Sequence, residues 1–268
     1  MTRPAVTPQL LRSVRPQLID ADWAVLEVLK RLRVATGLQL QLLTDGPDEA
    51  ARFRRRRQLT RLNKLGVISR MERRVVGGPE GGSASIVYTL DIAGKRLLDN
   101  SGASRRPWQP SSAFVAHAVA VTQVYVDLIL AQQRGELEVL RFDAEPKCWR
   151  HYTNHLGLQL ILKPDADVAL GVGEFEQHTF VEVDRATESR PRITRMARDY
   201  IDYFATGVEQ GRRGVTPKVV FLVPDERRQA VVVDALHQLP AEQWHHFGVA
   251  VATDTVGILS GEITETVT

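Results

Sequence analysis

The spacing of hydrophobic residues changes character near the middle of the chain. Before residue 99 they recur mainly at helical spacing, which predicts helices over 22–34, 38–43, 49–65 and 92–98. Residues 67–76 and 86–90 have the pattern of two strands, joined by a Gly-rich turn over 77–85. Three helices followed by a two-strand hairpin and a last helix predict a winged helix-turn-helix over residues 18–98.

The second half alternates helices with strands. Helices are predicted over 114–133, 191–205 and 225–239, and strands over 137–142, 158–162, 166–170, 179–184, 218–223 and 247–252. This order predicts an α/β fold with a mixed sheet and flanking helices, or α+β for the chain as a whole. The predicted organisation is therefore a flexible tail over 1–17, the winged helix over 18–98, a linker over 99–112, a second domain over 113–253 and a tail over 254–268.

The predicted helix over 49–65 is strongly basic. Residues 1–110 hold 20 basic and 10 acidic side chains, whereas residues 111–268 hold 15 and 22, so the two parts carry net charges of +10 and −7. Such asymmetry is typical of a protein with one end facing nucleic acid. We expect double-stranded DNA as the partner, although a solvated basic helix would show the same composition. The candidate DNA-binding residues are Arg54, Arg55, Arg57, Arg61 and Lys64 on the helix, with Arg70, Arg73 and Arg74 in the wing.

Four carboxylates lie on two predicted strands of the second half. Strand side chains alternate between faces, so Asp165 and Asp167 share one face of their strand, as Glu182 and Asp184 do of theirs. If the strands pair as a hairpin through 171–178, all four gather on one side, where they repel one another and need a cation. That cation is either a divalent metal, Mg²⁺ or Mn²⁺, or the guanidinium groups of Arg185, Arg192, Arg195 and Arg198. A solvated strand edge with surplus acid would show the same pattern.

The motifs resemble a known family. The predicted winged helix, the helix carrying His117, the Pro164-Asp165-Ala166 motif and the motif from Glu182 to Glu188 look like the replication-relaxation family of plasmids and other mobile elements. The resemblance runs from about residue 18 to residue 239, and the family's second half is similar to restriction-endonuclease-like PD-(D/E)XK nucleases and to plasmid mobilisation relaxases.

The resemblance implies roles for particular residues. Asp165 matches the first acid of the nuclease motif and Glu182 the second, and these two would hold the metal. Asp184 stands where a nuclease has Lys, so only a neighbouring arginine such as Arg185 would substitute for it, and arginine is a poor proton carrier. The catalytic candidates are therefore Asp165, Glu182, Asp184 and Arg185.

Three functions follow from these observations. The leading one is a DNA-binding protein of a mobile element, acting in replication, relaxation or mobilisation, whose second domain is nuclease-like and is a candidate for nicking DNA with a divalent metal. The first alternative is a non-catalytic regulator whose second domain dimerises or docks a partner. The second alternative is a metal-free module for DNA bending or complex assembly. The sequence leaves open both the enzymatic activity and a homodimer.

The cysteine count and the lengths of the apolar runs indicate which classes of protein are expected. Cys148 is the only cysteine, so an internal disulfide is excluded and a cytoplasmic location is expected. No run approaches 18 consecutive apolar residues, so no membrane span is expected. His151 and His155 have the i, i+4 spacing of metal ligands, but no second cluster matches them, and a zinc site is not favoured.

Overall fold

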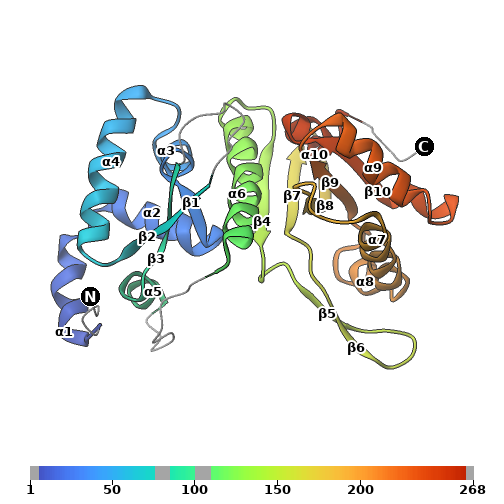
Figure 1. Cartoon of the computed structure of the whole chain (residues 1–268), viewed down its shortest axis with the longest axis horizontal. Coiled ribbons are helices and arrows are strands. Elements are labelled where there is room, and N and C mark those ends of the chain that lie inside the picture. The colour runs from blue at the N-terminus through green and yellow to red at the C-terminus, as the bar shows by residue number, and fades with distance from the viewer. Residues whose placement is uncertain (1–5, 76–84, 100–109, 264–268) are drawn as a thin grey trace. The chain divides into compact units, whose positions relative to one another are not determined.

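The computed structural model describes residues 6–75, 85–99 and 110–263, apart from the side chains of residues 72–75. The chain forms two compact units, Met1–Val126 and Asp127–Thr268. Each unit mixes helices with a sheet (Figure 1), and the sheet of the second unit holds parallel and antiparallel strands. The α/β class with a mixed sheet, predicted from the sequence, is therefore confirmed.

The first unit packs helices against a three-stranded antiparallel sheet of order β1-β3-β2. In chain order its elements are α1 (Pro8–Val14), η1 (Arg15–Gln17), α2 (Asp20–Leu32), β1 (Val34–Thr36), α3 (Gly37–Asp45), α4 (Glu49–Lys64), β2 (Ile68–Val75), β3 (Ser85–Leu90), α5 (Ile92–Asp99) and the first part of α6 (Ser112–Gln133). The predicted turn over 77–85 and the linker over 99–112 fall largely outside the described residues.

Local sequence signals fix the ends of the central helices. Thr36 and Gln39 form a reciprocal capping box at the start of α3. The Asp48 carboxylate accepts the N–H of Ala50 and begins α4. Gly66, at φ +70°, follows the C-cap residue Leu65 of α4 and has the left-handed conformation that glycine favours. A Cβ on Gly94 would lie 2.2 Å from the carbonyl oxygen of Val67, so only glycine lets α5 approach β2 this closely.

The N-terminal segment differs from the flexible tail expected over 1–17. Residues from Pro8 form helix α1, because Thr7 caps it and Pro8 favours a first helical turn. Val14 is buried and joins the core of the first unit with Leu26 and Leu59, while Leu10 packs against that core. The apolar residues between the prolines are too few for a strong periodic signal, but they are enough for a short helix held by tertiary packing.

Helix α6 has the length and composition that would allow it to cross a membrane. Val115 and Ala118 pack instead against Val34 and Val87 in a buried cluster of the first unit. The Thr122 hydroxyl also donates to the Val34 carbonyl at 2.8 Å. These contacts identify α6 as a core helix, which passes the same test of length and hydropathy.

The second unit is built on a five-stranded sheet of order β10-β9-β8-β7-β4. Strands β4, β7 and β8 are antiparallel neighbours, whereas β8, β9 and β10 run parallel. Its elements, after the end of α6, are β4 (Glu138–Ala144), β5 (Arg150–Thr153), β6 (Gln159–Leu162), β7 (Ala166–Val172), β8 (Phe175–Val183), α7 (Arg190–Ala205), α8 (Val208–Arg213), β9 (Lys218–Val223), α9 (Glu226–Leu236), η2 (Ala241–His246), β10 (Phe247–Val251), η3 (Ala252–Asp254) and α10 (Thr255–Ser260).

One face of this sheet holds the acidic residues Asp165, Asp167 and Glu182. Phe180, Phe221 and Phe247 belong to a core cluster with Ile193 of α7 and Leu236 of α9. Side chains alternate along each strand, so Glu182 points to the same face as Phe180. Helices α7 and α9 therefore cover the face on which the acidic residues lie.

Candidate functional site

Helix α4 turns one face to the core and the opposite face to solvent. Ala51, Leu59 and Leu62 are buried, and helical geometry places Phe53, Arg57, Thr60 and Lys64 on the opposite side. Phe53 is 65% exposed, and Arg57 and Lys64 are exposed as well. The exposed cations of the helix, including two that the sequence analysis did not select, are Arg52, Arg54, Arg56, Arg57 and Lys64.

Arg55 was expected to contact DNA, but its side chain is buried within the protein. Its side chain is 3% exposed and lies on the buried face of α4. It pairs with Asp45 at 2.7 Å and donates to Gln58 and to the Thr44 hydroxyl. The sequence pattern did not show this, because Asp45 lies in the preceding helix. Arg55 therefore holds α3 and α4 together.

Arg61 and Arg54 also form ion pairs within the protein. Arg61 pairs with the fully buried Asp22 of α2 at 2.5 Å. Burial alone would raise the pKa of Asp22, but hydrogen bonds from Arg61, Gln58 and the Ile19 N–H outweigh it and lower this pKa. Arg54 pairs with Asp48 at 3.2 Å through exposed side chains. Such a surface pair is weak in water, so Arg54 can still turn to a phosphate, whereas Arg61 is largely structural.

The wing residues are only partly described. Arg70 is exposed on β2, and its guanidinium donates to the Thr60 hydroxyl of α4 at 3.3 Å. The side chains of Arg73 and Arg74 lie outside the described residues. Arg70 therefore lies beside the outward face of α4.

In the second unit the structure brings Asp165 and Glu182 together. Strands β7 and β8 pair Ala166 with Val181, and the Asp165 N–H donates to the Val181 carbonyl at 3.1 Å. The next pair in this antiparallel register places Asp165 opposite Glu182, and the two side chains lie on the same face of the sheet. An oxygen of Asp165 accepts the Val183 N–H at 2.8 Å, and the Tyr200 hydroxyl donates to Glu182.

Burial and repulsion act together on Glu182. Its side chain lies under α7 and is 6% exposed. Desolvation, followed by the nearby negative charge of Asp165, raises the pKa of Glu182 well above its usual value. A strongly raised carboxyl pKa next to a second acid is characteristic of functional sites. Two hard carboxylates fit a divalent cation such as Mg²⁺, which protein sites commonly hold through one or two carboxylates with water or phosphate oxygens completing the shell.

This pair predicts an unusual pH dependence of stability. Because the folded-state pKa of Glu182 is raised, its contribution to folding is present at low pH and is lost as the pH rises through that pKa. Glu182→Gln keeps an acceptor for Tyr200 and removes the charge. The variant should melt above the wild type at pH 8 and like it at pH 4, and Mn²⁺ should raise the melting temperature of the wild type alone. Equal melting at both pH values, with no response to Mn²⁺, would contradict the proposed acid pair.

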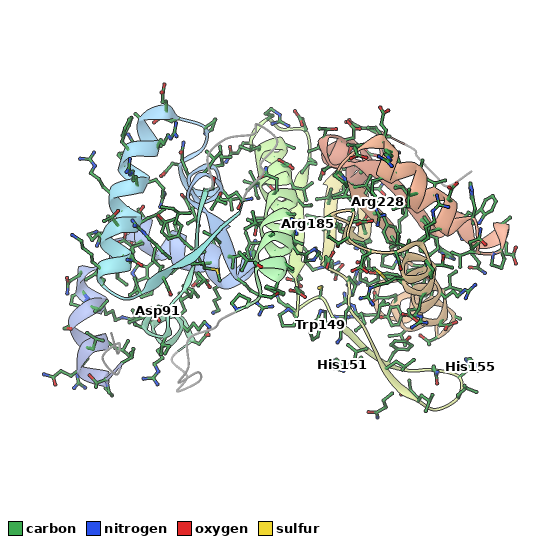
Figure 2. The ribbon with its side chains drawn as sticks, in the orientation of Figure 1. Asp91, Trp149, His151, His155, Arg185 and Arg228 are labelled. Carbon is green, nitrogen blue, oxygen red and sulfur yellow. The ribbon has the colours of Figure 1, made fainter. Side chains whose placement is uncertain are left out.

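Asp184 does not join the acid pair. Its carboxylate accepts from Arg228 Nε at 2.7 Å and from the Ala186 N–H at 2.7 Å. Arg228 also donates to the Glu188 carbonyl at 2.6 Å, so it ties α9 to the turn that follows β8. Arg185 is exposed on that turn (Figure 2). Asp184 thus has a structural partner, and Arg185 is the cation of the motif that remains exposed to solvent.

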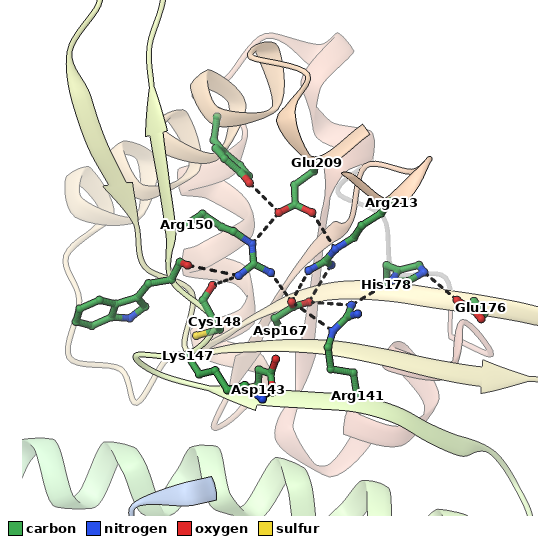
Figure 3. Close-up of polar contacts among 12 residues, drawn as sticks. Arg141, Asp143, Lys147, Cys148, Arg150, Asp167, Glu176, His178, Glu209 and Arg213 are labelled. Atoms are coloured by element: carbon green, nitrogen blue, oxygen red, sulfur yellow. Dashed lines mark hydrogen bonds and ion pairs between the residues drawn. The ribbon is translucent and has the colours of Figure 1, made fainter. Parts of the chain in front are cut away.

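Asp167 is the centre of a buried ion network (Figure 3). Arg150 and Arg213 both pair with its carboxylate, the latter at 2.5 Å, and Arg141 approaches at 3.5 Å. Arg150 and Arg213 also reach Glu209, at 2.7 and 3.0 Å. Burial would raise the pKa of Asp167, but the guanidinium groups, Arg213 first, outweigh it and lower this pKa. The network fixes α8 and β5 to β7.

The arginine stripe of α7, formed by Arg192, Arg195 and Arg198, was expected to pair with these acids, but it faces solvent. Arg192, Arg195 and Arg198 are all exposed, since α7 buries Ile193 and Ala197 instead. The cations that pair with Asp167 and Asp184 come from β4, β5, α8 and α9, and Arg192 acts on Glu182 only through its charge. Sequence reasoning missed them because β5 and α8 were not predicted, and an isolated arginine gives no signal of its distant partner.

The remaining candidate metal ligands, Cys148, His151 and His155, do not come together in one site. Cys148 is buried and its thiol donates to the Pro164 carbonyl at 2.9 Å, and burial raises its pKa strongly. His151 and His155 are exposed on the β5–β6 hairpin. Within the described ranges, no three His, Cys, Asp or Glu side chains form a group that could hold a metal. A cation at Asp165 and Glu182 would therefore rely on two protein side chains.

Comparison with known proteins gives one match. A family model described as replication-relaxation covers residues 26–219, which include both α4 and the acid pair. No curated protein and no solved structure matches the chain.

Proposed function

Because the chain belongs to the replication-relaxation family, we propose that it binds double-stranded DNA through a winged helix-turn-helix in its first unit, in the replication or mobilisation of a plasmid or another mobile element. Family membership itself supports the role in replication or mobilisation. The DNA-binding mode rests on the geometry of the first unit.

The observation that carries this proposal is the outward face of α4. Helices α3 and α4 are joined by a three-residue turn, 46–48, and β2 and β3 form a hairpin directly after α4. In a winged helix the second helix of the turn motif enters the major groove and the hairpin contacts the backbone. The core-facing side of α4 is fully occupied, so the cations left to contact DNA are the exposed ones, Arg52, Arg54, Arg56, Arg57 and Lys64.

Removing two of these cations should weaken DNA binding. Arg57→Ala combined with Lys64→Ala should lower affinity for a duplex on the order of tenfold per residue, because each charge-assisted hydrogen bond contributes about 1.5–3 kcal/mol. Both side chains are exposed, so the fold should persist. Fluorescence anisotropy with a labelled duplex measures the effect. Arg212→Ala with Arg227→Ala removes the same charge from exposed positions of the second unit and serves as the control.

The pair Asp165 and Glu182 supports a second candidate function, metal-dependent nicking of DNA. The second unit has three antiparallel strands followed by a helix and a parallel strand, an order compatible with the restriction-endonuclease-like core that the family resemblance implies. A divalent ion held there would polarise a phosphodiester or activate water. The pairing of Asp184 with Arg228 leaves the position of the usual Lys without a proton carrier, which favours slow nicking over rapid cleavage.

A further inference from the structure

A basic groove lies on the second unit between α7 and α9. Its volume is about 720 Å³, and its lining includes Arg190, Arg195 and Arg198 of α7 with Asp234 and His237 from α9 and its end. The Thr194 hydroxyl donates to the Ala235 carbonyl at 2.9 Å and links the two helices beneath it. Neither Asp165 nor Glu182 lines this groove.

The charges of the groove favour an anion. Its one carboxylate, Asp234, pairs with Arg190 at 3.1 Å through side chains that are 57% and 59% exposed. A pair so exposed is weak, and it leaves Arg195 and Arg198 as excess positive charge. The Nε2 atom of His237 is buried and has no hydrogen-bond partner among the described residues. The groove therefore offers several guanidinium donors to an anion, whereas the buried ring nitrogen is not accessible to one.

The spacing of the arginines fits a nucleic acid strand. Arg190 and Arg198 are eight residues apart, which is about 12 Å along a helix. Duplex DNA presents one phosphate per about 3.4 Å of axis on each strand, so this length spans about three steps between phosphates, or roughly four successive phosphates. Guanidinium groups bind phosphate oxygens in a bidentate manner. A single small phosphate would engage only part of such a row.

We propose that the groove between α7 and α9 binds the phosphodiester backbone of DNA. This site goes beyond the proposed function, which assigns DNA binding to the first unit, although it rests on the same nucleic acid being the ligand. It gives the second unit its own DNA contact, separate from the acid pair. The exposed arginine stripe of α7, which forms no ion pair with a buried acid among the described residues, thereby has a role.

The test is the salt dependence of duplex binding by the full chain. Arg195→Ala combined with Arg198→Ala should lower affinity about tenfold or more and make the slope of log affinity against log salt less negative by about 2, since each phosphate contact contributes about 0.9. The variant should melt like the wild type, because both side chains are exposed. Arg212→Ala with Arg227→Ala is again the control of equal charge. A groove variant with the affinity and slope of the wild type overturns the proposal.

A second comparison separates this proposal from that for the first unit. If the Arg57→Ala/Lys64→Ala variant binds DNA like the wild type while the groove variant binds weakly, the α4 proposal fails and the groove proposal stands. The reverse result rejects the groove alone. Calorimetry with inorganic pyrophosphate completes the test. Binding of pyrophosphate that the groove variant loses, with unchanged DNA affinity, would make the groove a site for a small phosphate and reject DNA as its ligand.

Discussion

Replacing Asp167 with Asn should destabilise the second unit by about 3–5 kcal/mol, which is typical when one partner of a buried ion network is removed. Arg150 and Arg213 are 7% and 8% exposed and share this carboxylate. The amide leaves the two guanidinium groups with Glu209 as their nearest anion. Hydrogen exchange of the β7 and β8 amides localises the effect to this unit. Asp143→Asn breaks a pair with Lys147, which is 77% exposed, and should cost less than about 1 kcal/mol.

The same network predicts how stability depends on pH. The folded-state pKa of Asp167 is lowered, so its stabilisation is present above the unfolded value, near 3.8, and is lost as the pH falls through the folded value. The wild type should therefore lose protection of β7 and β8 below about pH 4, and the Asn variant should show a smaller loss. Equal stability of variant and wild type at pH 7 would show that the network contributes no net stability.

Glu182→Gln should abolish metal-dependent nicking if the second candidate function holds. Supercoiled plasmid incubated with Mg²⁺ or Mn²⁺ should be converted to the relaxed form by the wild type. The variant should be slower by more than about 100-fold, because changes even beyond the first ligand shell of a metal typically cost 10–100-fold. Gln still accepts the Tyr200 hydroxyl, so the loss would be chemical and not structural.

Two further variants test whether nicking in that assay depends on Asp165 and Arg185. Asp165→Asn should lose nicking as well, whereas Arg185→Ala, at an exposed position, should reduce it only if this arginine reaches the scissile phosphate. Nicking that persists in both acid variants would assign it to another site or to a contaminant. The absence of metal-dependent nicking in the wild type would favour the non-catalytic regulator.

Strong periodicity predicted the long elements well. The basic helix expected over 49–65 is Glu49–Lys64, and the apolar strand expected over 218–223 is Lys218–Val223. Short elements were missed for physical reasons. β1 has three residues, β5 carries a buried arginine, and α8 has six residues after Gly207. Such segments are stabilised by tertiary contacts that no local pattern records. The tail expected over 254–268 likewise begins with α10, whose Ile258 and Leu259 are buried.

The candidate site was partly readable from the sequence. Period-two alternation predicted that Asp165, Asp167, Glu182 and Asp184 share one face of the sheet. The observed register agrees for the first three, whereas Asp184 lies beyond β8 and pairs with Arg228. Their partners were not readable, because Arg150, Arg213 and Arg228 come from distant segments. The pattern also did not separate Arg55, which is buried against Asp45, from Arg57, which faces solvent. In both regions the difference between a structural and a functional charge lies in its tertiary partner.

The salt dependence of duplex binding by the unmodified chain tests the central claim most directly, because it counts phosphate contacts. The exposed cations of α4 are Arg52, Arg54, Arg56, Arg57 and Lys64. If four or five of them contact phosphates, the slope of log affinity against log salt should be about −4, or steeper if the second unit contributes. In the Arg57→Ala/Lys64→Ala variant the slope should be less negative by about 2. A wild-type slope near zero, or a variant with the wild-type slope, would contradict DNA binding through α4.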